Sequence, residues 1–243
     1  MTYRRSLTVS LLPVAVVLAA CGPGDTLPMR DAPGETTSSM STAPLPVAGR
    51  STVYAPHGMV ATSQPLASTA ALRILQEGGN AFDAAIAASA VLSLVEPHMT
   101  GLGGDMFALA WSADEGGLVG LDASGRAGAL MSPEQIRADG HDDVPYQGPG
   151  SVTVPGAIAG WGALNERYGS LPLSRILAPA IELAEVGFPV SPIIARQWAN
   201  EEDLLRDDPG ATATYLPGGS PPAAGDWFTN PGLATSLRMI ADQ

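Results

Sequence analysis

The sequence predicts an α/β fold of the α+β type, in which a pair of strands separates two groups of helices. Residues 65–76 and 81–95 have helical apolar patterns with boundary signals at both ends. Residues 107–111 and 118–121 are short apolar runs joined by Asp114-Glu115-Gly116-Gly117, which is typical of a hairpin turn. The rest of the folded part consists mainly of helical segments bounded by Gly, Ser and Pro.

The folded part begins with a short strand, predicted for residues 59–62, and two helices. Pro65 stands near the first position of the first helix, where its missing N–H does no harm. Glu77-Gly78-Gly79 ends that helix, and Asn80 is the expected N-cap of the next one. In residues 81–95, 12 of the 15 side chains are apolar and six are Ala. A helix that is apolar on nearly every side is expected to be buried on nearly every side.

Glycine-rich segments flank the two hairpin strands. The turn Gly101-Leu102-Gly103-Gly104-Asp105 precedes a strand, whereas the glycines of a dinucleotide-binding motif precede a helix. We therefore interpret the turn as backbone that lies close against another segment. Residues 122–128 form the loop after the second strand, and Arg126 is the only cation in it. A strand is expected next at residues 151–154. Three helices are expected at 157–168, 175–186 and 192 to about 206. A long loop at 207–226 and a last helix at 231–243 complete the chain.

The first 20 residues are typical of a signal peptide. Arg4 and Arg5 precede an apolar run of about 14 residues, which is too short to span a bilayer. Leu18-Ala19-Ala20-Cys21 resembles a bacterial lipobox, which implies a mature N-terminus at Cys21 that is lipidated on its sulfur and amine. We therefore expect a periplasmic or cell-envelope protein with a lipid anchor in the membrane. The alternative is an ordinary signal peptide followed by a chance cysteine.

Composition divides the rest of the 243-residue chain and excludes several functions. Residues 21–50 are rich in Pro, Gly, Ser and Thr and predict a flexible linker, which leaves residues 51–243 as the folded part. The net charge is -12, and all 12 basic residues are Arg. An acidic chain without basic clusters argues against a nucleic-acid partner. The absence of Lys excludes Schiff-base chemistry, and a single cysteine excludes an intrachain disulfide framework.

No complete active site is apparent from the residue types alone. His57, His98 and His141 do not occur at metal-ligand spacing, so we expect no metal site, and no cofactor motif is present. A Ser–His–Asp triad stays open because its members meet only in space, although no G-x-S-x-G motif supports one. We interpret His98 as a helix-end residue, and Asp83 as a capping or paired carboxylate in its apolar helix, not as catalytic groups.

Several sequence blocks together resemble the gamma-glutamyltransferase family of N-terminal-nucleophile hydrolases, which includes the glutathione hydrolases. The resemblance covers roughly residues 53–243, and the blocks occur in the family's order. They are residues 59–68 (MVATSQPLAS), 78–85 (GGNAFDAA), 96–97 (EP) with 101–105 (GLGGD), 154–156 (VPG), and 177–181 (LAPAI) through 184–190 (AEVGFPV).

The resemblance implies an αββα sandwich formed by a self-cleaving precursor of well over five hundred residues. The freed N-terminal threonine of the smaller, C-terminal subunit is the nucleophile in that family, and its own α-amine is the base. The substrates are γ-glutamyl amides such as glutathione, whose acyl group is hydrolysed off or transferred to an amine. By this resemblance the chain is the first part of the larger subunit. It would hold no catalytic residue, be inactive alone, need the missing small subunit as partner, and fold poorly without it.

One loop departs from the family pattern. The family's arginine for the substrate α-carboxylate lies in a motif of the form Arg-Glu-x-Ala-Pro, which corresponds here to Ser124-Gly125-Arg126-Ala127-Gly128. Ser124 then takes the arginine's place, and Arg126 follows two residues later. Arg126 is the predicted substrate-binding residue, because its guanidinium can bind a carboxylate with two hydrogen bonds; the alternative is a surface arginine.

The shifted loop leaves three functions open. The leading one is the first part of a γ-glutamyl hydrolase or transferase. The second is a related amidohydrolase whose acyl group is not glutamyl, such as one directed at oxamate. The third is a non-catalytic periplasmic lipoprotein that binds a ligand or partner.

Overall fold

The computed structural model describes residues 52–242, so the signal segment, Cys21 and the linker predicted for residues 21–50 lie outside the described residues. The chain divides into two compact units at His57 and Gly58. Residues 52–57 of the first unit have no regular secondary structure. Within residues 52–242, no helix is both long enough and apolar enough to cross a bilayer.

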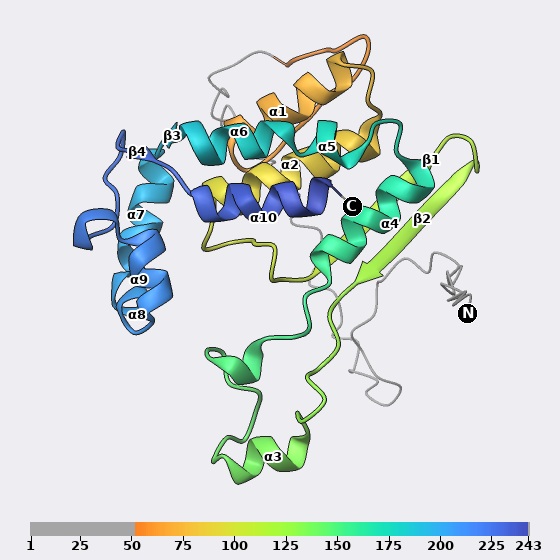
Figure 1. The fold of residues 1–243 in the computed structure, drawn as a ribbon. Coiled ribbons are helices and arrows are strands. Elements are labelled where there is room, and N and C mark those ends of the chain that lie inside the picture. Colours follow the sequence, from red (N-terminus) through yellow and green to blue (C-terminus); the bar gives the residue numbers. More distant parts are fainter. Residues whose placement is uncertain (1–51, 243) are drawn as a thin grey trace, which may run out of the picture. The chain divides into compact units, whose positions relative to one another are not determined.

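Helix α2 (Ala81–Val95) is central to the fold (Figure 1). Helix α1 (Pro65–Gln76) packs along it, and α4 (Ala157–Tyr168), α5 (Leu173–Ile176) and α6 (Ala178–Val186) contact it as well. Ten of its 15 residues are buried, as its alanine-rich sequence predicts. Because most of its side chains are small, the neighbouring helices approach it closely.

The boundaries of α1 and α2 follow from capping. Pro65 occupies the first position of α1, and the Gln64 side chain accepts a hydrogen bond from the backbone N–H of Leu66. The Asn80 side chain caps α2, and Asp83 returns the bond by accepting from the Asn80 N–H at 3.0 Å. This is a capping box, which satisfies backbone donors that the helix cannot. The interpretation of Asp83 as a capping residue is confirmed.

Strands β1 (Met106–Ser112) and β2 (Gly117–Ala123) form the predicted hairpin, with Met106 opposite Ala123 and Ser112 opposite Gly117. Helix α4 lies along one face of this hairpin (Figure 1). The other face is apolar and exposed. Its exposed apolar side chains are Phe107, Leu109, Trp111 and Leu118.

The last third of the chain is helical. Helix α10 (Pro231–Ala241) packs against α6 and α5. A second, two-residue sheet pairs β3 (Phe188–Pro189) with β4 (Trp227–Phe228). The remaining elements are α3 (Pro133–Ala138), η1 (Pro149–Ser151), α7 (Pro192–Asn200), α8 (Glu202–Arg206), α9 (Pro209–Tyr215) and η2 (Pro217–Gly219). The mixed helix and strand content agrees with the predicted class; the αββα sandwich stays a prediction.

Two predicted strands are wrong. Residues 59–62 are extended but form no ladder, and the hydroxyl of Thr62 instead bonds Gln64 O at 2.6 Å at the start of α1. Residues 151–154 make one backbone bond to the loop after β2, from Val154 N–H to Arg126 O at 2.9 Å. A single bond does not make a strand, because a ladder repeats its bonds along both partners.

Three predictions in the C-terminal part need correction. The helix expected at 175–186 is two helices, broken between Ile176 and Ala178, because Pro179 has no N–H and disfavours helical backbone before it. The helix from residue 192 breaks at Glu201. The loop predicted for 207–226 contains α9, which Asp208 caps by accepting from Ala211 N–H at 2.7 Å.

Candidate functional site

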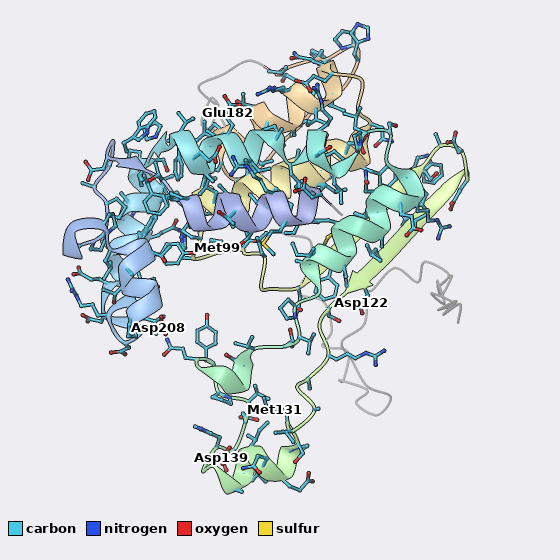
Figure 2. The ribbon with its side chains drawn as sticks, viewed as in Figure 1. Met99, Asp122, Met131, Asp139, Glu182 and Asp208 are labelled. Carbon is cyan, nitrogen blue, oxygen red and sulfur yellow. The ribbon has the colours of Figure 1, made fainter. Side chains whose placement is uncertain are left out.

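Three loops meet at one end of the β1–β2 hairpin, and we call their contact the loop junction: residues 101–105, 124–126 and 153–156. The first loop precedes β1, the second follows β2, and the third leads into α4. Gly104 O accepts hydrogen bonds from Gly156 N–H at 3.1 Å and from Ala157 N–H, at the start of α4, at 3.0 Å, which joins the first loop to the third. Figure 2 labels Asp122, which lies in β2 just before the second loop.

Asp105 ties all three loops together. Its Oδ1 accepts a hydrogen bond from Gly125 N–H at 2.7 Å and another from the Thr153 hydroxyl at 3.0 Å. Val154 N–H donates to Arg126 O at 2.9 Å beside them. The backbone on both sides of the Gly125–Arg126 peptide is therefore held by hydrogen bonds to other loops.

The junction is too close-packed for side chains at two of its glycines. A Cβ on Gly125 would lie 1.9 Å from Val154 O, and a Cβ on Gly156 would lie 2.0 Å from Ala123 O. Both neighbours are backbone atoms, which cannot rotate away. Gly125 and Gly156 therefore allow the loops to lie in direct backbone contact.

Asp122, the second-last residue of β2, binds the start of the second loop. Its Oδ1 accepts a hydrogen bond from Ser124 N–H at 2.8 Å. The pKa of Asp122 is lower than its ordinary value, because hydrogen bonds from Ser124 favour the carboxylate form. The bond from the Ser124 backbone N–H is the larger cause, and the bond from its side chain is the smaller one. Ser124 itself is exposed.

Arg126, the predicted substrate-binding residue, is exposed at this junction. Five other arginines form ion pairs with glutamates: Arg73, Arg167, Arg175, Arg206 and Arg238. Within residues 52–242, no carboxylate pairs with Arg126. A guanidinium on a fixed backbone and without an internal partner is suited to bind an anion from solution.

The histidines do not assemble a catalytic group within the described part. His98 Nε2 lies 3.1 Å from Gln197 Oε1, which joins the end of α2 to α7, and His98 Nδ1 is buried without a partner there. His141 is exposed in the loop after α3, and His57 belongs to the other unit. No cluster of three or more His, Cys, Asp or Glu in this part could hold a metal ion.

A groove of about 480 Å³ lies between α2, α4 and β1. Phe82, Ile86, Trp161 and most residues of β1 line it, and none of its lining side chains is an acid or a base. Its lining hydroxyl belongs to Ser89, whose Oγ accepts a hydrogen bond from Trp161 Nε1 at 3.2 Å. The groove therefore offers mainly apolar contact area, and Arg126 is not among its lining residues.

Sequence reasoning missed Asp105 and Thr153 as members of the junction. Asp105 ends the glycine-rich turn, and its position directly before a strand was the available signal. Nothing in the pattern pairs it with Gly125, 20 residues later, or with Thr153, 48 residues later. Such a contact depends on how three loops fold together, which spacing along the chain does not encode.

Comparisons with known proteins agree with this architecture. The Klebsiella pneumoniae "Oxamate amidohydrolase proenzyme" is 42% identical over 193 residues, which cover 76% of this chain and 36% of that protein. The Bacillus subtilis "Glutathione hydrolase-like YwrD proenzyme" is 40% identical over 186 residues, covering 76% of this chain and 35% of that one. The chain thus spans about a third of the length of these relatives.

A solved structure and a family profile point the same way. The crystal structure of cephalosporin acylase from Bacillus halodurans superposes with a TM-score of 0.76 at 44% identity, covering 83% of this chain and 38% of that chain. The family profile described as gamma-glutamyltranspeptidase matches residues 67–243, which include the whole loop junction. This chain therefore belongs to the gamma-glutamyltranspeptidase family.

Proposed function

We propose that this chain is the first part of the larger subunit of a self-cleaving amide hydrolase. The family membership supports this proposal, as does the word "proenzyme" in the names of relatives of which the matched residues cover only about a third. In the complete protein, the N-terminal threonine hydroxyl of the second subunit attacks the substrate amide carbon, and the threonine α-amine takes the hydroxyl proton. The amide C–N bond then breaks, the leaving amine takes that proton, and the acyl group remains on the threonine as an ester. The acyl group leaves the threonine by transfer to water or to an acceptor amine.

The role of this chain is to bind the acyl part of the substrate through Arg126. The observation that carries this role is the exposed guanidinium of Arg126, without an ion-pair partner in residues 52–242, on backbone fixed by Val154. The substrate is therefore an amide whose acyl group bears a second, free carboxylate. γ-Glutamyl amides such as glutathione meet this requirement.

A second substrate class is favoured by the loop sequence. Ser124, not arginine, occupies the family's carboxylate-binding position, and Arg126 lies two residues later. A displaced guanidinium suits an acyl group whose carboxylate is closer to the amide, as in oxamate. A relative at 42% identity carries the name oxamate amidohydrolase. The non-catalytic alternative, a binding lipoprotein, would use the same arginine for a ligand.

The test uses the full-length protein that contains the second subunit. Gel electrophoresis shows whether the precursor is cleaved, and kcat/KM is measured for glutathione, oxamate and an acyl amide without a carboxylate. Arg126→Ala is expected to lower kcat/KM about 10- to 100-fold for the carboxylate-bearing substrates only, because a hydrogen bond to a charged group contributes about 1.5–3 kcal/mol. Arg137→Ala, an exposed arginine in α3, is the matched control.

The outcome distinguishes the proposed functions. Higher kcat/KM for glutathione than for oxamate supports the γ-glutamyl function, and the reverse order supports the amidohydrolase. An uncleaved precursor that binds these ligands without turnover supports the binding protein. An unchanged kcat/KM in Arg126→Ala contradicts the role of Arg126.

We also propose that the protein is anchored to a bacterial membrane from the periplasmic side through lipidated Cys21. The proposal rests on the signal-like sequence before Cys21, and on the linker composition of residues 22–50, which would separate a lipid anchor from the folded part.

A further inference from the structure

We propose that Asp105 is a positioning residue for substrate specificity, which acts by fixing the backbone that presents Arg126. This inference rests on the proposed carboxylate-binding role of Arg126. Asp105 needs no contact with the substrate, because its two hydrogen bonds go to Gly125 N–H and the Thr153 hydroxyl. Asp105 instead determines the position of the Arg126 guanidinium.

Asp105 is well placed to fix that backbone because its own position is fixed from two sides. It is the last residue before β1, which is paired with β2 along seven residue pairs. Directly before it, Gly104 O accepts two hydrogen bonds from the start of α4, donated by Gly156 N–H and Ala157 N–H. The carboxylate thus extends from the junction of a strand and a helix, both of which pack into the fold.

The loop that Asp105 holds has little other means of keeping its shape. Beyond the turn that Asp122 makes with Ser124 N–H, Gly125 has no side chain with which to pack. Glycine also has the largest conformational freedom to lose. The Asp105 carboxylate, which accepts from the Gly125 N–H, fixes the Ser124–Gly125 peptide, one peptide before the one that joins Gly125 to Arg126. Val154 N–H then holds the Arg126 carbonyl on the other side.

The close backbone contact makes this restriction sensitive to small displacements. The space in which a Gly125 Cβ would stand lies 1.9 Å from Val154 O and 2.5 Å from Thr153 Oγ1. Thr153 is the second donor to Asp105, so a single oxygen holds the two segments face to face at this point. Without that oxygen, the Gly125 N–H and the Thr153 hydroxyl both lose their acceptor.

The expected consequence is a selective loss of affinity. Removing the acceptor lets the Arg126 backbone adopt several positions, of which a fraction places the guanidinium at the substrate carboxylate. The observed affinity for the substrate falls to that fraction of its original value. Asp105→Ala in the full-length protein is expected to raise KM about 5- to 30-fold for the carboxylate-bearing substrate, with kcat changed less than about threefold.

Four matched variants test the role. Asp105→Asn keeps an oxygen that accepts from both donors, so KM is expected to return to within about threefold of the unaltered protein. Thr153→Val removes one donor and is expected to raise KM less than Asp105→Ala does. Asp114→Ala removes an exposed aspartate at the opposite end of the hairpin and is the control. Asp105→Ala combined with Arg126→Ala completes a double-mutant cycle.

The cycle separates positioning from a general structural role. If Asp105 acts through Arg126, its substitution has no further effect in the Arg126→Ala background and none on a substrate without the carboxylate. Equal losses on both substrates, or additive losses in the double variant, overturn the inference about Asp105 while leaving Arg126 as the carboxylate ligand. If Arg126→Ala itself leaves KM unchanged, the proposed function fails together with this inference, and the two failures are distinguishable.

Discussion

Asp83 is expected to be a principal stabilising group of this fold, because it is a fully buried carboxylate that joins three segments. None of its surface is exposed. Oδ2 accepts hydrogen bonds from Asn80 N–H and Ser170 N–H, each at 3.0 Å, and Asn165 Nδ2 lies 3.5 Å from Oδ1. The N-terminus of α2, the end of α4 and the segment leading into α5 are thereby held to one side chain.

The substitution Asp83→Ala removes the acceptor that these donors share. Loss of half of the capping box costs about 1 kcal/mol. Loss of the hydrogen bond from the Ser170 N–H to this charged group costs about 1.5–3 kcal/mol more. We therefore expect the free energy of unfolding to fall by about 2–4 kcal/mol. This is a large fraction of the 5–15 kcal/mol typical of a folded domain.

In Asp83→Asn, the free energy of unfolding is expected to fall less, by about 1–2 kcal/mol. The amide oxygen of the new side chain still accepts from the N–H groups of Asn80 and Ser170, but its NH₂ group faces the Asn165 amide. Urea unfolding followed by the fluorescence of buried Trp161 and Trp198 gives both values. Asp203→Ala, an exposed aspartate in the first turn of α8, is the control. A loss below about 1 kcal/mol in Asp83→Ala would refute this account.

The other predictions concern backbone contact, pH, anchoring and activity. Gly156→Ala is expected to lower the free energy of unfolding by about 1–3 kcal/mol, because the new Cβ would clash with Ala123 O. Gly162→Ala, which has open space in helix α4, is expected to raise it by about 0.5–1 kcal/mol. Equal melting temperatures of the two variants would contradict the clash. Hydrogen bonds from Arg73 and Arg175 lower the pKa of Glu77 from 4.5, so its stabilising effect is complete above about pH 4.5 and is lost as the pH falls through the lower folded-state pKa. In Glu77→Gln, the fall in the free energy of unfolding at acid pH is expected to be smaller. A pH dependence of stability identical to that of the unaltered protein would contradict this role of Glu77. Palmitate labelling is expected to mark the unaltered protein and not Cys21→Ser, and equal labelling contradicts the anchor. The 243-residue chain alone is expected to cleave no γ-glutamyl anilide, and a burst of product contradicts this expectation.

The helices of this fold were largely predictable because their signals are local. Asn80, Pro65 and the alanine-rich pattern of residues 81–95 mark α1 and α2 at their observed boundaries. Helix α9 carries the same kind of signal, an aspartate cap followed by proline, at Asp208 and Pro209. The Pro and Gly residues around this signal predict a loop instead, and they outnumber it.

Strands and the site were less predictable because they depend on partners distant in sequence. The hairpin has its partner five residues away and was predicted, whereas residues 59–62 and 151–154 have strand-like composition but no ladder. Arg126 was identified through its charge and the family resemblance. Asp105 was not, because its role is visible only once Gly125 and Thr153 are seen beside it.

The backbone contact at Gly125 and Gly156 has a consequence for how this family could diversify or be engineered. Neither position accepts a side chain without moving a carbonyl of the facing segment. Ser124 and Arg126, on either side of Gly125, are exposed and carry no such restriction. A mutant library randomised at these two positions would sample new acyl preferences on an unchanged backbone, whereas one that includes Gly125 would consist largely of misfolded loops.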